Sequence, residues 1–263
     1  GNSCVGWATT YYAMSIMYNQ KFNITDYFEK EANAFDPSSI FLWDSIEDYC
    51  DLGTNFNDAL DVLKFKGAKK LNFFPKIVPC QNEFAFDNSM INSYVKPFAI
   101  GDIYPLSNIY SNGRSFIDEY GINGFKYFIN KMNLPIICGF NIPKSFDNIS
   151  SNGLWTPIIG EETGNMGHAL TIVGYDDYKF GGSFKLINSY GENWGDNGFL
   201  WIKYADIDKY LKYSYAMEFR NEFNVTSSIQ IKTKNFIKLN NKDGSSYEGE
   251  FLNETFHGYG VFK

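Results

Sequence analysis

The stretch GHALTIVGYDDYKFGGSFKLINSYGENWGDNGFLWIKY, residues 167–204, carries the strongest structural pattern in the chain. It contains three runs rich in apolar and β-branched residues, HALTIVGYDD, SFKLINS and GFLWIKY, which short connections containing glycine separate. Runs of this kind with tight connections predict three strands of an antiparallel meander.

Helical patterns dominate the chain before this stretch. The apolar spacing predicts helices over three segments: 4–19, 56–68 and 122–133. In the second segment Asn57 or Asp58 is the expected N-cap, and Gly67 is the expected end. Residues 134–142 form an apolar run that predicts a buried strand, and 68–120 predict loops with short strands. Because helices come first and strands last, we expect an α+β fold with segregated halves.

The composition limits the classes of function. With 263 residues, of which 44% are hydrophobic, the chain is long enough to bury a large core. Its net charge of −7 argues against nucleic acid or an anionic membrane as the main partner. No apolar run approaches the roughly 20 residues of a membrane helix, so we expect no transmembrane segment. The cysteines show no CxxC spacing, and we expect neither a metal nor another cofactor.

Three residues form a candidate catalytic set. Cys4 lies where the first helix begins, and a helix N-terminus favours the reactive thiolate. His168 begins the first strand of the meander, and a histidine is the natural general base for a thiol. Asn188 lies near the end of the neighbouring strand, where its side-chain oxygen can orient the imidazole. Each also has a plain structural interpretation: a small buried thiol, a half-exposed strand residue and a turn former.

Five segments resemble the papain-like cysteine peptidases, especially the bacterial-type branch of that family. GNSCVGWA, GHALTIVGYDD and LINSYGENWGDNGFLWIKY resemble the three catalytic blocks of the family. CDLGTNFNDALDVLKFKGA resembles its substrate strip with the following helix, and NLPIICGFNI resembles the strand that opens its second half. The resemblance implies a papain-like two-half fold over residues 1–220. A helical half would hold the nucleophile helix, and an antiparallel β half would carry the histidine and the asparagine.

The family pattern implies a role for each of these residues. Cys4 would be the nucleophile, His168 the general base and Asn188 the residue that orients the base. Peptide hydrolysis would pass through a thioester, with the backbone N–H of Cys4 donating to the oxyanion. Gly53 resembles the glycine whose backbone pairs with an extended substrate, and Trp194 resembles the aromatic wall on the leaving-group side.

The chain departs from the family pattern at three places. The second oxyanion donor of the family is a glutamine a few residues before the cysteine, at a position that would fall ahead of Gly1 and outside this sequence. Tyr190 stands where the family usually has a tryptophan that shields the Asn–His hydrogen bond. The usual partner cysteine before the nucleophile is replaced by Gly1 or Asn2, so Cys50 and Cys80 either pair with each other or are free thiols.

The tail YEGEFLNETFHGYGVFK, residues 247–263, resembles one MORN repeat, a β-hairpin unit with regular glycines and aromatic residues. His257 is then a repeat residue, and the polar stretch 221–246 is expected to be a connector. Because one repeat cannot bury its own apolar face, we expect the tail to pack on the preceding domain or to continue into further repeats. The tail is also the expected contact for a protein or lipid partner. A fortuitous glycine–aromatic hairpin is the alternative.

The sequence therefore predicts a cysteine peptidase with protein or peptide substrates. The alternative from another class is a catalytically silent papain-like scaffold or binding module that uses the tail for interaction. A third hypothesis keeps the thiol chemistry but changes the acceptor, as in transglutaminase-like or deamidating enzymes. The presence of all three residues of the catalytic set favours the peptidase.

Overall fold

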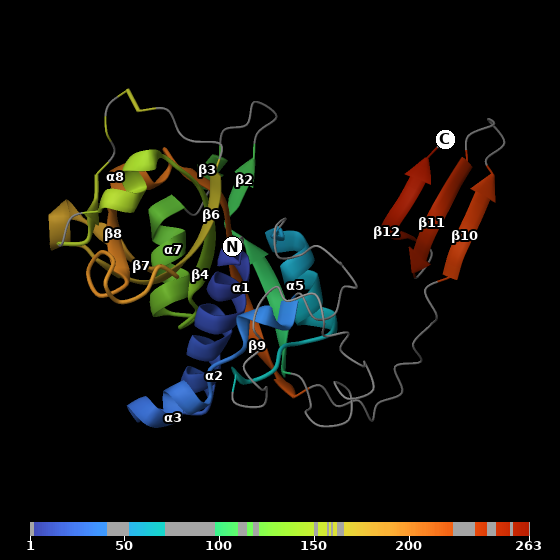
Figure 1. The fold of residues 1–263 in the computed structure, drawn as a ribbon, viewed down its shortest axis with the longest axis horizontal. Helices are drawn as coiled ribbons and strands as arrows, with labels where there is room; N and C mark the ends of the chain where they lie inside the picture. Colours follow the sequence, from blue (N-terminus) through green and yellow to red (C-terminus); the bar gives the residue numbers. More distant parts are fainter. Residues whose placement is uncertain are drawn as a thin grey trace. The chain divides into compact units, whose positions relative to one another are not determined.

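The computed structural model describes residues 3–40, 53–71, 98–109, 115–117, 121–149, 152–156, 158, 160–161, 166–222, 235–240, 246–252 and 255–262. The chain divides into two compact units, Gly1–Phe223 and Asn224–Lys263 (Figure 1). In the described part of the chain, no helix is long and apolar enough to cross a membrane.

The first unit combines short helices with one large sheet. Its helical elements are α1 (Cys4–Gly6), η1 (Trp7–Met14), α2 (Ser15–Lys21), α3 (Tyr27–Ala32), η2 (Pro37–Ile40), α5 (Phe56–Phe65), α7 (Gly121–Asn130), η4 (Lys144–Asn148), η5 (Lys179–Gly181) and α8 (Tyr204–Ile207). Its strands are β1 (Phe98–Pro105), β2 (Ser107–Ile109), β3 (Ser115–Ile117), β4 (Ile136–Ile142), β5 (Leu154–Trp155), β6 (Met166–Asp176), β7 (Ser183–Ile187), β8 (Phe199–Lys203) and β9 (Leu211–Glu222).

The sheet has seven strands in the order β1-β9-β4-β6-β7-β8-β5. Its neighbouring strands are antiparallel, except that β5 and β8 are parallel. The predicted meander is confirmed, since β6, β7 and β8 follow one another in the chain and in the sheet. η1 and α7 both pack against β4 and β6, the strands at the middle of the sheet (Figure 1).

Strand β4 is buried on both faces, as its apolar run predicts. Ile137 of β4 and Ala169 of β6 belong to one apolar core, which also contains residues of η1 and α5. Ile136 and Leu170 belong to a second core together with Phe125 of α7. Because successive side chains of a strand point to opposite faces, a strand between two cores needs apolar residues at consecutive positions.

The first predicted helix is continuous but changes its winding. The helical segment runs from Cys4 to Lys21, and its middle part, η1, is a π-helix. In this part the Thr171 hydroxyl of β6 donates a buried hydrogen bond of 2.9 Å to the Ala8 carbonyl. π-helical turns are rare and often occur at functional sites. The sequence pattern did not reveal the wider turns, which occur where the segment contacts the sheet.

The predicted cap of the second helix is wrong, but its predicted end is right. Asn55, not Asn57 or Asp58, caps α5, because its Oδ1 accepts the backbone N–H of Asp58 at 3.0 Å. Gly67 has a φ of 76°, and its N–H donates to the Val62 carbonyl at 2.9 Å. A glycine just past a helix reaches this left-handed conformation without steric cost.

The region predicted as loops with short strands contains a longer element. β1 has eight residues and pairs with β9. The predicted disulfide alternatives cannot be followed further, since Cys50 and Cys80 both lie outside the described residues. Cys138 is a free thiol within β4, and burial raises its pKa well above the usual range.

The second unit contains a three-stranded antiparallel sheet in the order β10-β11-β12. Its strands are β10 (Asn235–Asn240), β11 (Ser246–Leu252) and β12 (Thr255–Phe262). β11 and β12 form a hairpin in which Leu252 pairs with Thr255. The stretch 221–246, predicted as a connector, contains β10, which pairs with β11 along its whole length. It is therefore not a simple linker.

Candidate active site

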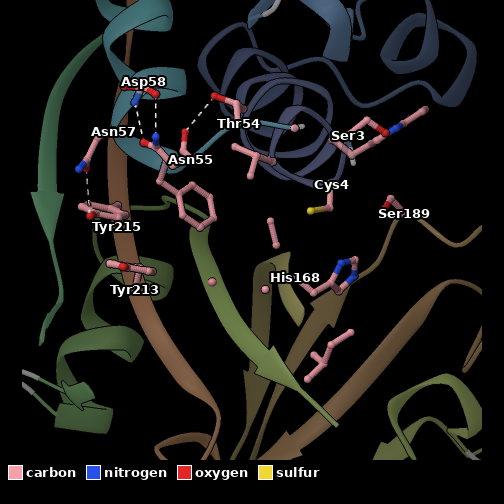
Figure 2. A pocket seen from close by; sticks show the side chains of 18 of the residues that line it. Ser3, Cys4, Thr54, Asn55, Asn57, Asp58, His168, Ser189, Tyr213 and Tyr215 are labelled. Atoms are coloured by element: carbon pink, nitrogen blue, oxygen red, sulfur yellow. Dashed lines mark hydrogen bonds between the residues drawn. The ribbon is translucent and has the colours of Figure 1, made fainter. Parts of the chain in front are cut away.

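Cys4 is the first residue of the helical segment and has a partly exposed free thiol. Val5 and Ala8, buried in the first core, hold this end of the segment in place. Gly6 allows the segment to approach η2 closely, because a Cβ at this position would lie 2.5 Å from the Pro37 carbonyl oxygen. Cys4 therefore lies at the N-terminus of a firmly packed helix. Its side chain lines a pocket, with His168 beside it (Figure 2).

His168 and Asn188 form a buried pair. The imidazole Nε2 lies 2.8 Å from the Asn188 Oδ1 atom. The strand register produces this proximity, since Thr171 of β6 pairs with Ile187 of β7 and Asn188 comes directly after β7. The structure therefore brings together the two residues that the sequence analysis expected on neighbouring strands.

A second hydrogen bond identifies the Asn188 atom in this contact and, with it, which imidazole nitrogen of His168 carries the proton. Asn188 Oδ1 also accepts the backbone N–H of Ser189 at 2.8 Å. A backbone N–H can only donate, so the shared atom must be the amide oxygen, and His168 must donate to it through Nε2–H. Nδ1 is then the unprotonated nitrogen of the neutral imidazole, and it remains available for the Cys4 thiol.

Asn188 is also held through its backbone. Its N–H donates to the Gly198 carbonyl at 3.0 Å, and its carbonyl accepts the Tyr12 hydroxyl at 3.1 Å. Tyr12 belongs to η1, so this bond joins the helical segment to the end of β7. Burial, with the neighbouring Tyr11 adding to it, raises the pKa of Tyr12 to about 12, so the hydroxyl remains a donor.

Three aromatic rings surround the imidazole. The centroid of the Tyr190 ring lies 5.1 Å from that of His168, and the centroid of Phe146 lies 5.6 Å from it. Trp194 packs on both, with centroid distances of 5.4 Å to Tyr190 and 5.3 Å to Phe146. His168 is only 7% exposed as a result. The Tyr190 ring therefore lies beside the imidazole, and its role in shielding the Asn–His hydrogen bond stays a prediction.

Burial and the neighbouring groups act in opposite directions on the pKa of the His168 imidazole. Burial lowers the pKa of His168, whereas the hydrogen bond to Asn188 and the charge of Asp147 act to raise it. The pKa of Tyr190 is raised by burial first and then by the charges of Asp147 and Cys4. The charge of Asp147 therefore favours an imidazolium against the cost of burying it.

The pocket beside this pair has a volume of about 940 Å³. One end holds Cys4, His168 and Ser189, whereas the other end is bordered by α5 and β9 (Figure 2). Within the described residues, no group of three or more His, Cys, Asp or Glu side chains could hold a metal ion.

The two expected substrate-binding residues differ in their positions. Gly53 lines the pocket with a φ of 69°, a conformation that favours glycine. Trp194 is not among the residues that line the pocket, and it contacts Tyr190 and Phe146 instead. Trp194 therefore supports the two aromatic rings that lie beside His168.

Residues 123–218 match the family model described as papain family cysteine protease. The fold is papain-like. The papain-like fold is shared with xylellain, a cysteine protease from Xylella fastidiosa, at 18% identity and a TM-score of 0.54, over 82% of this chain and 79% of that one. It is shared with the clostridial cysteine protease Cwp84 at 18% identity and a TM-score of 0.60, over 84% of this chain and 54% of that one. It is also shared with the bromelain protease from Ananas comosus, solved in complex with the E64 inhibitor, at 16% identity and a TM-score of 0.56, over 83% of this chain and 90% of that one.

The family match and the papain-like fold support a cysteine protease. The chain spans about half of the Cwp84 chain and 59% of a pro-form ragweed cysteine protease, so it corresponds to only part of those chains. No curated protein matches the chain.

Several residues of the site escaped the sequence analysis. Tyr12 and Phe146 are ordinary aromatic residues in their local patterns, and only the folded chain brings them to Asn188 and His168. Tyr213 and Tyr215 also line the pocket. Their spacing of two residues within a strand would have placed both on one face, which is a signal that sequence could have provided.

Proposed function

We propose that the chain hydrolyses peptide bonds, with Cys4 as nucleophile, His168 as general base and Asn188 as the residue that orients the imidazole. Nδ1 of His168 takes the thiol proton, and the thiolate adds to the carbonyl carbon of the substrate. The backbone N–H of Cys4 donates to the oxyanion. The imidazolium then protonates the leaving amine as the C–N bond breaks, which leaves a thioester on Cys4.

The second half of the reaction restores the thiol. Neutral His168 takes a proton from a water molecule, and the resulting hydroxide adds to the thioester carbonyl. The C–S bond breaks, the peptide acid leaves, and the sulfur regains a proton from the imidazolium. The observation that carries this proposal is the 2.8 Å contact of His168 Nε2 with Asn188, because it leaves Nδ1 for a thiol that lines the same pocket.

The proposal is tested by alkylation and by turnover together. Iodoacetamide at mildly acidic pH should modify Cys4 far faster than Cys138, because Cys4 lines the open pocket beside the proposed base, whereas Cys138 is buried and its pKa is raised. The Cys4→Ala chain should lose cleavage of casein by about 10⁴-fold or more. The Cys138→Ala chain is the control, since its buried side chain affects stability rather than the reaction. Equal alkylation of both cysteines would contradict the proposal.

The same experiment separates the peptidase from its alternatives. A chain that is alkylated rapidly at Cys4 but cleaves no peptide would favour a scaffold, or an enzyme that transfers acyl groups to other acceptors. In the transfer case, added primary amines would be incorporated into glutamine side chains of the acceptor protein. Cleavage that disappears with Cys4→Ala leaves only the peptidase.

We further propose the finer assignments that follow from the sequence. Residues 1–220 form the peptidase domain, related to the bacterial-type branch, and residues 247–263 act as one MORN-like repeat for a protein or lipid partner. The pairing of Gly249 with Gly260 in the β11–β12 hairpin agrees with the regular glycines of such a unit. Binding of the full chain to anionic lipid vesicles, compared with a chain ending at Phe223, tests the lipid partner.

A further inference from the structure

We propose that the pocket selects a basic side chain, arginine or lysine, of the peptide substrate; this rests on the proposed peptidase function. The binding position is the end of the pocket away from Cys4, which we call the aromatic end. It is lined by Phe56, Asn57, Asp58, Gly139, Tyr213 and Tyr215. Figure 2 shows Tyr213, Tyr215, Asn57 and Asp58 on the opposite side of the pocket from Cys4 and His168.

Three aromatic rings form the walls of the aromatic end. Tyr213 and Tyr215 alternate along β9, so both project from the same face of that strand. The Phe56 ring of α5 meets the Tyr215 ring at a centroid distance of 6.0 Å and an angle of 51°. Tyr213 is 44% exposed and therefore accessible to a ligand. The faces of such rings carry partial negative charge and attract a cation.

The floor of the aromatic end is already filled, which favours a long side chain over a bulky one. A Cβ at Gly139 of β4 would lie 2.9 Å from the Phe56 ring and 3.2 Å from the Tyr213 ring. The two rings thus converge on the backbone of β4 and leave no hole beneath them. A flexible alkyl chain can lie across the ring faces and carry its charged group to the rim.

The rim supplies a charge of the right sign. Asp58 is the one acidic side chain among the described residues that line the pocket, and no lysine or arginine is among them. Its Oδ2 accepts from Asn55 Nδ2 at 2.6 Å, whereas Oδ1 has no hydrogen-bond partner in the described part of the chain. A guanidinium or ammonium group can pair with this oxygen, but a carboxylate ligand would be repelled. An apolar side chain would contact the rings and leave the carboxylate unused.

The test uses the full chain and four fluorogenic peptides that differ in one residue on the acyl side of the cleaved bond. The residue is arginine, its neutral isostere citrulline, norleucine or glutamate, and it is moved through successive positions. At one position we expect kcat/KM for arginine to exceed that for citrulline about tenfold, the sum of a cation–π contact and an exposed ion pair. Glutamate should be the poorest substrate at that position.

Matched variants identify the residues responsible. Asp58→Asn should lower the arginine-to-citrulline ratio about threefold, whereas Asp61→Asn removes the same charge from the same helix outside the pocket and should leave the ratio unchanged. Tyr213→Leu should lower the ratio through loss of the cation–π contact. If Asp58→Asn fails to fold, Tyr213→Leu and the fall of the ratio at high salt decide the question.

The outcomes distinguish this inference from the function on which it rests. Cleavage that depends on Cys4 but shows an arginine-to-citrulline ratio near one at every position overturns the inference and leaves the peptidase intact. A preference for norleucine over arginine overturns it as well. If none of the four peptides is cleaved and Cys4 shows no selective alkylation, the proposed function itself fails.

Discussion

Asn188 shows how closely one residue can be held by the fold. Its side-chain oxygen accepts from His168 and Ser189, its N–H donates to Gly198, and its carbonyl accepts from Tyr12. Three of these four contacts come from within or near the strands of the meander. The fourth comes from the helical segment that also carries Cys4. We therefore regard Tyr12 as a positioning residue that relates the proposed base to the proposed nucleophile.

Removing the Tyr12 hydroxyl should disturb the proposed reaction more than the fold. Tyr12→Phe loses a hydrogen bond worth about 1 kcal/mol and allows Asn188 and the imidazole to shift. We expect kcat to fall about threefold to tenfold, with a change in the pH profile of kcat/KM and a small change in melting temperature. Tyr11→Phe is the matched control on the same π-helix, since its hydroxyl makes no hydrogen bond within the described residues. The same loss in both variants would contradict the role of Tyr12.

The protonation of His168 leads to a separate prediction for the Cys4→Ala chain, which lacks the neighbouring thiol. Burial lowers the pKa of this imidazole in the folded chain, so the unfolded chain takes up the proton more readily. The neutral imidazole therefore stabilises the fold above the ordinary histidine pKa of about 6.5, and this stability is lost as the pH falls toward the lowered folded value. The loss is at most about 1.4 kcal/mol per pH unit.

Thermal melts of Cys4→Ala between pH 7 and pH 5 measure this effect. The double variant Cys4→Ala/His168→Gln serves as the reference, because glutamine keeps a donor toward Asn188 but does not titrate. We expect the single variant to lose more stability on acidification than the double variant. Parallel curves would show that the imidazole has an ordinary pKa in the folded chain.

At the level of elements, the start of the helical segment lies very close to the backbone of η2 at Gly6. Gly6 lies in a helical conformation that alanine would normally favour, yet a Cβ there would lie 2.5 Å from the Pro37 carbonyl oxygen. Since the conflicting atom belongs to the backbone, η2 or the segment must move. The position of Cys4, two residues earlier, is coupled to that movement.

Gly6→Ala should therefore destabilise the chain by about 1–3 kcal/mol, the usual range for overpacking, and slow the alkylation of Cys4. Chemical denaturation and iodoacetamide kinetics measure the two effects. Gly174→Ala is the comparison, because the nearest atom to a Cβ there is Lys185 Cβ at 4.0 Å, an ordinary contact distance. A Gly6→Ala chain that is more stable than the original would show that helix propensity outweighs the contact.

For the whole molecule, the two compact units suggest separable stability. The buried residues of both described apolar cores all come before position 220. The seven-stranded sheet is complete by Glu222, the last residue of β9.

A chain that ends at Phe223 should then melt within a few degrees of the full chain and retain selective alkylation of Cys4. Differential scanning calorimetry of both chains tests this expectation. A large fall in melting temperature on truncation would show that Asn224–Lys263 stabilises the first unit.

Much of this architecture follows from local pattern. The meander, the buried strand β4, the helix α7 and the end of α5 at Gly67 all agree with periodicity and turn residues read from the sequence. The N-cap of α5 differs from the prediction. Asn55, Asn57 and Asp58 are all capable caps, and the choice depends on where the preceding chain approaches the helix. The polar composition of 221–246 predicts a connector and hides β10, in which Ile237 and Leu239 nonetheless alternate with Lys238 and Asn240.

The candidate site also has a part that the sequence predicts and a part that only the folded chain shows. Cys4, His168 and Asn188 could be found from residue type, order and position at element ends, since those features are local. The tautomer of His168, the Tyr12 contact and the rings of Phe146 and Tyr190 around the imidazole required the folded chain. So did the aromatic end of the pocket, where α5, β4 and β9 meet. These features depend on which side chains from distant segments come within a few ångströms, and a linear pattern does not encode that distance.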